Sequence, residues 1–398
     1  MKIAVVITCF RYRSHAHVFL ENFLEPYLFN GKKVEPNCQI VSMYVDQFLK
    51  SDMSRDVARR YGIKIYPTIA KALCLGGRRL NVDAVLSIAE HGSYSINRYG
   101  QKRYPRKRFF DQIADVMRSS KRSVPVFMDK HLSYRWDWAK GIYDTSQELK
   151  IPIMVGSSVP LAQRRPSLEL PRHAKITEAL SMHGGEVERY GFHALEVLQS
   201  MVEARQGGET GVASVEYFKG KRLYDQAWSQ KLAIAAIATE LGKPPRSFDR
   251  IPGEPIGTPQ GWMIRYVDGL KAMVYLVGRN DMRWNFACRL AGERQARSTH
   301  FYVGPWRNRN LFKALSHAIQ HHFHTGRSPY PVERTLLTTG LTEALMRARD
   351  QPGQPLSTPH LEFSYKARNF KSMREMGASW NILTDEIPEP RGLDSFCG

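Results

Sequence analysis

The sequence predicts two domains, a doubly wound parallel α/β sheet at the N-terminus and an α+β domain on a large, mainly antiparallel open sheet. A chain of 398 residues is too long for one ordinary core. Over about the first 155 residues, short strands rich in Val and Ile alternate with helices. Beyond about residue 160, β-rich runs separated by glycine-containing turns replace this alternation. We therefore expect domains at residues 1–158 and 159–360, followed by a C-terminal extension at residues 361–398.

The N-terminal domain is predicted from apolar runs that are short enough to be buried parallel strands. These runs span residues 3–7, 39–45, 63–66, 84–88, 124–128 and 151–155. Helical stretches between them span residues 15–27, 54–61, 107–118 and 136–149. Gly62 follows the second helical stretch, where a left-handed residue commonly ends a helix. This regular alternation indicates helices on both faces of one sheet.

The C-terminal domain is predicted to begin with a helix over residues 186–204, because apolar residues recur on one face there. The β-rich runs that follow span residues 213–218, 262–277, 283–290 and 299–303. Asp268-Gly269 interrupts the second run and is a strong hairpin signal. Helices at residues 310–323 and 333–349, then a proline-rich tail, complete the chain. Hairpins and helices in this order indicate an α+β domain.

Three chemically active residues, Asp129-Lys130-His131, follow directly after the apolar run that ends at residue 128. In an open parallel sheet, ligands bind in the crevice at the carboxyl ends of the strands. A lysine desolvated in such a crevice has a lowered pKa, which makes it a useful acid or base near neutral pH. The alternative is an ion pair at a solvated strand end. We predict that these three residues belong to a catalytic site.

Composition and cysteine usage are typical of a folded cytoplasmic protein. Hydrophobic residues make up 42% of the chain, yet no apolar run is long enough to span a bilayer. The N-terminus enters a predicted strand at once, so we expect no secretory signal. The five cysteines are scattered, which favours reduced thiols over disulfides or a zinc site. We therefore predict a cytoplasmic location.

The chain is strongly basic, with 58 basic and 38 acidic residues and a net charge of +20. Basic and aromatic residues mix at residues 101–110, a pattern that could bind nucleic acid, attract an anionic small substrate, or be a solvated loop. No known nucleic-acid motif accompanies the charge, which is spread along the chain. We expect a small-molecule substrate that can be anionic, and neither nucleic acid nor membrane as a partner. A non-catalytic or nucleic-acid-binding protein that uses this positive charge is an alternative.

Several motifs in a consistent order resemble the glucose–fructose oxidoreductase / inositol dehydrogenase (Gfo/Idh/MocA) family. They correspond to the family's second helix and following turn, its Glu-Lys-Pro motif, the helix of its catalytic histidine, and its usual ending. The matching segments are residues 54–62 (SRDVARRYG), 66–73 (YPTIAKAL), 129–131 (DKH), 183–196 (from HGG to GFHALE) and 326–349. The resemblance covers about residues 1–350.

This resemblance implies a Rossmann-like domain that binds NAD or NADP, and oxidation or reduction of a sugar, cyclitol or related polyol hydroxyl. It also implies a homo-oligomer, a dimer or tetramer, formed through the second sheet. By position, Lys130 would bind the reacting oxygen and His193 would be the general acid/base, with Asp129 and His131 beside them. An imidazole suits removal of the hydroxyl proton, and a neighbouring cation stabilises the developing alkoxide. The positions expected to contact the cofactor are Arg11, Arg13, Ser14, Asp46, Glu90 and His91.

The first strand–helix turn departs from the dinucleotide pattern. That fold needs glycines there so that the backbone can approach the pyrophosphate, but residues 7–15 contain none. Phe10 and Tyr12 would occupy that space. Arginine side chains at 11 and 13 could still hold phosphates by charge, the serine at 14 could cap the following helix, and Asp46 matches the acid that holds the ribose. A nucleotide-independent lyase, isomerase or hydrolase on a carbohydrate, using the same pocket, is therefore the alternative.

A bound divalent metal ion is a further alternative, since carboxylate and imidazole groups are suitable ligands for Mn, Zn or Fe. The residues that could converge on one crevice are Glu90, His91, Asp129, His131 and His193. Their spacing does not establish a site, so we assign no metal ligand.

Overall fold

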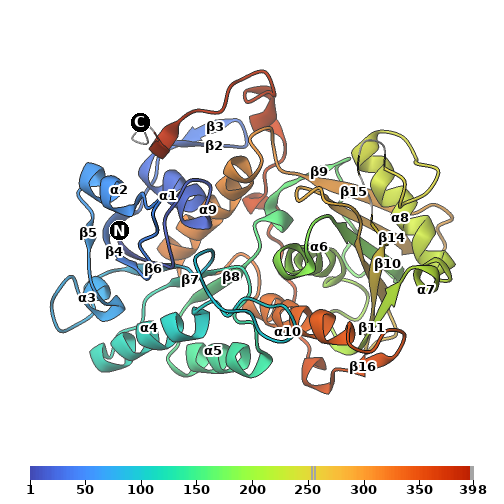
Figure 1. Ribbon diagram of the computed structural model, residues 1–398, viewed down its shortest axis with the longest axis horizontal. Helices are drawn as coiled ribbons and strands as arrows, with labels where there is room; N and C mark the ends of the chain where they lie inside the picture. The colour runs from blue at the N-terminus through green and yellow to red at the C-terminus, as the bar shows by residue number, and fades with distance from the viewer. Residues whose placement is uncertain (252–253, 255–256, 395–398) are drawn as a thin grey trace.

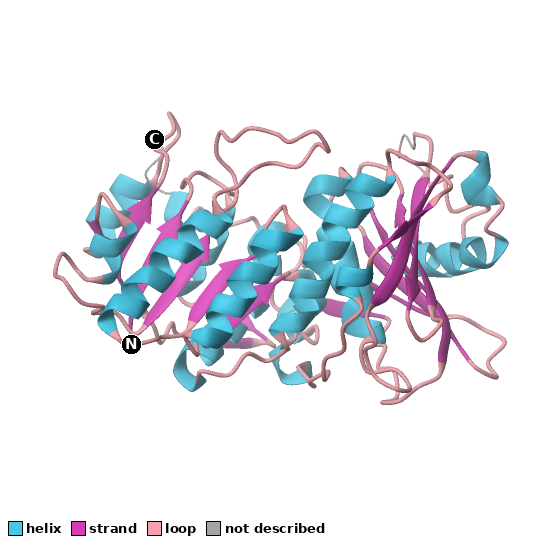
Figure 2. Cartoon of the chain, turned by 90° about the horizontal axis from the view of Figure 1, so that it is seen from below, coloured by secondary structure: helices cyan, strands magenta, loops and turns pink. Residues whose placement is uncertain are grey.

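The computed structural model describes every residue of the chain except 252–253, 255–256 and 395–398. Two sheets lie side by side, with helices packed around them and between them (Figures 1 and 2). None of the described helices is long and apolar enough to cross a lipid bilayer.

The N-terminal sheet is parallel throughout, and its described strands follow the order β5-β4-β1-β6-β7-β8. The bounds are β1 Lys2–Ile7, β4 Gln39–Val45, β5 Lys64–Ile65, β6 Ala84–Ile88, β7 Val126–Asp129 and β8 Ile153–Gly156. A separate hairpin pairs β2 (Tyr27–Phe29) with β3 (Lys32–Val34). The parallel sheet predicted from the sequence is confirmed.

Helices cover both faces of this sheet (Figure 1). One face packs against α1 (His15–Leu24), α2 (Ser54–Tyr61) and α9 (Asn308–Thr325). The other packs against α3 (Ile69–Leu73), α4 (Arg106–Ser120) and α5 (Trp136–Glu148). The doubly wound, Rossmann-like architecture expected from the sequence is therefore present.

The second sheet is large and mixed, and its described strands follow the order β16-β11-β12-β13-β10-β14-β15-β9. Only β10 and β13 pair in parallel; the other pairs are antiparallel. The bounds are β9 Gln163–Arg165, β10 Ile176–His183, β11 Val212–Lys219, β12 Gln260–Tyr266, β13 Lys271–Leu276, β14 Trp284–Leu290, β15 Arg297–Tyr302 and β16 Pro355–Ser357. The mainly antiparallel sheet predicted for the C-terminal domain is confirmed.

Helices also cover both faces of the second sheet. On the side toward the N-terminal domain lie α6 (Phe192–Val202) and α10 (Val332–Ala348) (Figure 1). On the other side, α8 (Ala227–Leu241) and the short α7 (Lys221–Tyr224) pack on apolar residues of the sheet such as Met273 and Tyr275. The homo-oligomer implied by the family resemblance stays a prediction, and α8 occupies part of the sheet face that it would use.

The C-terminal extension returns to the N-terminal domain after β16. Glu389 forms ion pairs with Arg13, just before α1, and with Arg309 of α9. Arg309 also pairs with Glu21 of α1. The extension therefore joins the two ends of the chain across the face formed by α1 and α9 (Figure 1).

Some elements differ from the sequence expectations for identifiable reasons. The first helix ends at Leu24 rather than residue 27, because Glu25 precedes Pro26 and adopts an extended conformation. The helix expected from residue 186 begins as a π turn, Val187–Gly191, and becomes α-helical at Phe192. Strand β10 has no counterpart among the expectations, since half of its sequence ITEALSMH consists of good helix formers and it shows no clear alternation of apolar and polar residues.

Candidate functional site

A cavity of about 350 Å³ opens where the carboxyl ends of β1, β6 and β7 face the second domain. Residues from both domains line it, including Lys130 after β7, Glu90 and His91 after β6, and His193 at the start of α6. This is the end of a parallel sheet at which ligands bind. The structure therefore brings Lys130 and His193 to one cavity.

Lys130 is held at the cavity wall by its backbone and its ion pair. It follows β7 directly and adopts a left-handed conformation with φ of 63°, which an L residue rarely takes without a compensating contact. Its side chain is 8% exposed, and Nζ donates to Glu90 Oε1 at 3.0 Å. Nζ also lies 3.5 Å from the backbone oxygen of Arg189, in the π turn before α6. These contacts aim the ammonium group across the domain boundary.

Glu90 is the buried counter-ion of two cations. Arg106 of α4, fully buried, forms a close ion pair with the second carboxylate oxygen. Burial alone would raise the pKa of Glu90, but Lys130 and Arg106 hold that pKa well below its usual range. One negative charge thus faces two positive charges at the cavity floor. The surplus positive charge favours an anionic ligand, or a substrate oxygen that becomes negative during reaction.

His193 presents one ring nitrogen for a ligand. Nδ1 lies 2.6 Å from Ser157 Oγ, which also accepts from the backbone N–H of Val159 at 3.0 Å. Within the described residues, no hydrogen bond to Nε2 is recorded. The ring packs edge-on against Trp284 of β14, with centroids 5.3 Å apart. Burial, then the charge of Lys130, lowers the pKa of His193 well below its usual range, so the imidazole is neutral at pH 7.

Two further histidines, His15 and His91, lie in the part of the cavity wall that the N-terminal domain forms. His15, the first residue of α1, has Nδ1 2.6 Å from Asp129 Oδ2, and its ring meets His91 edge-on at 5.1 Å. His91 Nδ1 lies 3.5 Å from Arg11 Nη2. Burial, then the charge of His15, lowers the pKa of His91 to about 3. His91 is therefore a neutral group in this wall of the cavity.

Asp129 and His131 do not line the cavity, although the sequence predicted them there. The Asp129 carboxylate is buried against His15 and so acts on the site only through that ring. His131 is buried behind the cavity, its ring packed edge-on against Phe192 at 5.4 Å. Their proposed catalytic roles stay predictions without a direct contact to support them.

The residues expected to bind a nucleotide separate into two groups. Arg11 and Arg13 line the cavity, as do Glu90 and His91. Arg13 donates a hydrogen bond to Asn308 Oδ1 at 2.9 Å and forms an ion pair with Glu389. Ser14 is buried and accepts from the N–H of His17, so its role is the helix cap of α1.

The expected ribose acid, Asp46, is fully engaged by the protein itself. Its Oδ1 accepts from Tyr44 at 2.8 Å and from Arg108 at 2.6 Å, and its Oδ2 accepts from Tyr94 at 2.7 Å. Next to it, Gln47 exchanges two hydrogen bonds with the backbone of Ser93, at 2.8 and 2.9 Å. The loops after β4 and β6 are therefore joined over the place where an adenosine ribose would lie.

The first turn is also filled. Phe10 is fully buried and belongs to the core under α1, and its backbone oxygen accepts from the N–H of Met53 at 2.8 Å. A dinucleotide needs glycine backbone at this turn so that the pyrophosphate can approach the helix. Together with the engaged Asp46, this means that the residues present do not fit the adenosine and pyrophosphate parts of NAD or NADP.

The described residues form no group of three or more His, Cys, Asp or Glu side chains arranged to hold a metal ion. The five candidate ligands do not converge, because Asp129 faces His15 and His131 faces Phe192. Glu90 is already neutralised by Lys130 and Arg106. We therefore assign no metal ligand in this cavity.

Several residues of the site carried no usable signal in the sequence. Arg106, His15, Ser157 and Trp284 are distant along the chain from Lys130 and His193, and none belongs to a recognisable motif. A buried arginine inside a helix rich in basic residues looks like any solvated arginine until its partner is known. Only the folded structure brings these four residues close to Lys130 and His193.

No protein-family model matches the sequence, and no curated protein matches it. Solved structures do match the fold. GenD2 from gentamicin A biosynthesis, solved in complex with NAD, superposes with a TM-score of 0.59 at 10% identity, over 90% of this chain and 96% of that chain. A putative myo-inositol dehydrogenase from Sinorhizobium meliloti 1021 gives 0.57 at 11% identity, over 90% and 99%. The apo scyllo-inositol dehydrogenase of Lactobacillus casei gives 0.55 at 10% identity, over 90% and 98%.

These similarities extend over nearly the whole length of each neighbour, so both domains and their order are shared. At about 10% identity they establish the architecture, and the resemblance seen in the sequence motifs agrees with it. The chain therefore has the fold of the inositol and sugar dehydrogenases of the Gfo/Idh/MocA type.

Proposed function

We propose that this protein is an enzyme that transfers a proton on a sugar, cyclitol or related polyol bearing a carbonyl group, in the cavity between its domains. His193 takes the proton, and Lys130 stabilises the oxygen that becomes negative. The observation that carries the proposal is that these two side chains, one a neutral base and one a paired cation, line the same cavity. The reaction class is isomerisation or elimination, and no dinucleotide takes part.

The two residues supply the minimum that such chemistry needs. Removing a proton next to a carbonyl requires a base within reach of the carbon and positive charge at the enolate oxygen. For the neutral ring of His193 to accept the proton on Nε2, its Nδ1 must carry the hydrogen and donate it to Ser157 Oγ, 2.6 Å away. Lys130, held by Glu90, donates to the oxygen, and the excess charge from Arg106 strengthens that field. In an isomerisation the imidazolium returns the proton to another position of the enolate. In an elimination it protonates the β-hydroxyl, whose C–O bond breaks as the enolate collapses, and water leaves.

A second candidate is the NAD(P)-dependent dehydrogenase implied by the family resemblance. The specific observation in its favour is the fold shared with GenD2, whose structure contains NAD. On this chain it requires that Asp46 leave Tyr44, Tyr94 and Arg108 and that the turn at Phe10 open. We rank it second because these contacts would have to break before a nucleotide could enter.

The proposal is tested by hydrogen–deuterium exchange into substrate without added nucleotide. A panel of ketoses, aldoses, inosose and sugar acids is incubated with the purified protein in D₂O and followed by proton NMR. We expect exchange or conversion of at least one compound, lowered about 10²- to 10⁴-fold in His193→Ala and about 10²- to 10³-fold in Lys130→Met.

Matched variants keep this test specific. Lys140→Met removes an exposed lysine of α5, and His324→Ala removes an exposed histidine of α9; both should match the wild type. Turnover that appears only with added NAD or NADP would reject this proposal and support the second candidate, an NAD(P)-dependent dehydrogenase. Exchange that survives in both His193→Ala and Lys130→Met would reject the site itself.

A further inference from the structure

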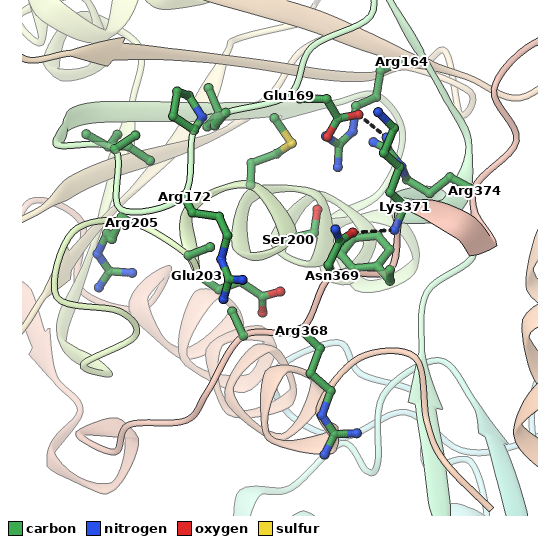
Figure 3. Close-up of a pocket in the computed structure, with 18 residues that line it drawn as sticks. Arg164, Glu169, Arg172, Ser200, Glu203, Arg205, Arg368, Asn369, Lys371 and Arg374 are labelled. Atoms are coloured by element: carbon green, nitrogen blue, oxygen red, sulfur yellow. Dashed lines mark hydrogen bonds and ion pairs between the residues drawn. The ribbon is translucent and has the colours of Figure 1, made fainter. Parts of the chain in front are cut away.

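A second cavity, of about 290 Å³, lies at the opposite end of α6 from His193 and shares no residue with the first. It is bounded by β9 and the loop that follows, by the last turn of α6, and by residues 367–374 of the C-terminal extension (Figure 3). The only acids in its lining are Glu169 and Glu203. Its basic lining residues are Arg164, Arg172, Arg205, Arg368, Lys371 and Arg374.

Two of these arginines are buried without enough negative charge to balance them. The side chains of Arg164 and Arg374 are 8% and 3% exposed, and both pair with the one carboxylate of Glu169 (Figure 3). Glu169 itself is 43% exposed. Among the described residues, no hydrogen-bond acceptor reaches Arg164 Nε, Arg374 Nε or Arg374 Nη1. Buried charges without partners are costly, so such groups indicate a missing anion.

The other charges at this cavity do not supply that anion. Glu203 Oε2 accepts hydrogen bonds from Arg334 Nε at 2.9 Å and from the hydroxyl of Tyr365 at 3.0 Å. Arg205 is balanced separately by Asp268 and Glu209. Burial and then the nearby charge of Arg374 lower the pKa of Arg164 to about 9, which reflects the same surplus of positive charge.

Exposed cations extend the basic surface around the opening. Arg172, Arg368 and Lys371 are exposed residues that line the cavity (Figure 3). Guanidinium groups bind phosphate through paired N–H donors, and lysine adds a point charge. Beside them, apolar side chains of Leu170 and Met201 line the cavity, which is larger than a single inorganic anion requires.

We propose that this second cavity binds the phosphate group of a small phosphorylated metabolite. Arg164 and Arg374 supply the uncompensated positive charge that attracts the phosphate, and the exposed Lys371 and Arg172 contact it. The apolar wall holds the organic part. The site lies outside the cavity of the proposed reaction and does not depend on that reaction being assigned correctly.

Isothermal titration calorimetry on the full chain tests this proposal, with glucose 6-phosphate, inorganic phosphate and unphosphorylated glucose as probes. We expect saturable binding of glucose 6-phosphate and none of glucose. Tighter binding of the ester than of phosphate supports the role of the apolar wall. Equal binding supports free phosphate as the source of the same anion.

Substitutions of residues that line the second cavity test whether the phosphate compound binds there. Arg374→Met and Arg164→Met should weaken it about tenfold or more, and the exposed double change Arg172→Gln/Lys371→Gln should weaken it several-fold without affecting folding. Arg59→Gln, which removes a highly exposed charge on α2, is the matched control and should bind as the wild type does. Lys130→Met should also retain binding, because it alters only the first cavity.

The proposal is overturned if no phosphate compound binds saturably, or if Arg172→Gln/Lys371→Gln binds as tightly as Arg59→Gln. It is equally overturned if Lys130→Met abolishes the binding while the second-cavity variants keep it. Thermal unfolding of each variant in buffer without phosphate distinguishes lost binding from lost structure.

Discussion

Chemistry at the residue scale centres on Glu90, which holds Lys130 and Arg106 together inside the protein. Neither cation has another carboxylate among the described ion pairs. Two buried positive charges would repel each other if this carboxylate were removed, and each would lose its best hydrogen-bond acceptor. Glu90 is therefore a positioning residue for Lys130 as well as a structural one.

Glu90→Gln should lower the free energy of unfolding by about 3–5 kcal/mol at pH 7, because it leaves buried charges uncompensated. Urea denaturation followed by circular dichroism measures this. Glu35→Gln, which changes an exposed carboxylate, should have no measurable effect. A loss of less than about 1 kcal/mol in Glu90→Gln would show that the triad is solvated in solution.

The stability that Glu90 contributes depends on pH, and the direction of this dependence follows from its lowered pKa. The pKa of folded Glu90 lies well below its usual value of 4.5, so its contribution is complete above pH 4.5. It is lost as the pH falls from 4.5 toward the folded pKa. Over that window the wild type should lose stability faster than Glu90→Gln, and parallel curves would contradict the depressed pKa.

At the element scale, most strands of the N-terminal sheet could be predicted because each is a short apolar run between clear helical patterns. The C-cap at Gly62 was also predictable, and its φ of 65° confirms the left-handed conformation. Strand β10 and helix α8 were missed because tertiary packing decides their state. The sequence of α8 is apolar nearly all round, with no amphipathic pattern to mark it, and it packs on the second sheet.

The site was predictable only in part for the same reason. Lys130 and His193 stand in motifs that resemble those of the Gfo/Idh/MocA family, so their shared cavity could be expected from that resemblance. The contacts of Asp46 could not, because its partners Tyr94 and Arg108 come from the loop after β6 and from α4. A carboxylate after the second strand looks the same in sequence whether it binds a ribose or two tyrosines and an arginine.

The structural role of Asp46 leads to a distinct stability prediction. Asp46→Ala removes the acceptor of two tyrosine hydroxyls and of Arg108, so it should lower the free energy of unfolding by about 1–3 kcal/mol. Chemical denaturation of Asp115→Ala provides the control, since Asp115 is exposed on α4 and pairs only locally. Unchanged stability in Asp46→Ala would mean that the acid is free for a ligand.

At the scale of the whole molecule, the two domains, the joined loops and the returning C-terminal extension together enclose many histidines. Burial is the largest cause that lowers the pKa of each one. The pKa is clearly lowered in the buried His17, His131, His183, His193 and His322, and in the partly buried His91. Each must become protonated in the unfolded chain below about pH 6.5, while the folded protein keeps it neutral.

The protein should therefore lose stability as the pH falls from about 6.5 toward 4, by about 1.4 kcal/mol per pH unit for each such histidine. Denaturant unfolding at a series of pH values measures this slope. His183, whose pKa is lowered to about 4 by burial, is outside the proposed catalytic site. His183→Gln should reduce the slope by about one proton, and His324→Gln, on the surface, should leave it unchanged. Equal slopes in both variants would contradict the neutral burial of His183.

The central claim concerns the space where a dehydrogenase of this fold would hold a nucleotide. Side chains of this chain are engaged with one another there, and we propose that the neighbouring cavity acts without a nucleotide. Calorimetric titration of the wild-type protein with NAD and NADP, each in oxidised and reduced form, tests this most directly. We expect no saturable binding up to millimolar nucleotide. Micromolar binding that is lost in Asp46→Ala, with the folded structure intact, would show that Asp46 holds a ribose and would contradict the claim.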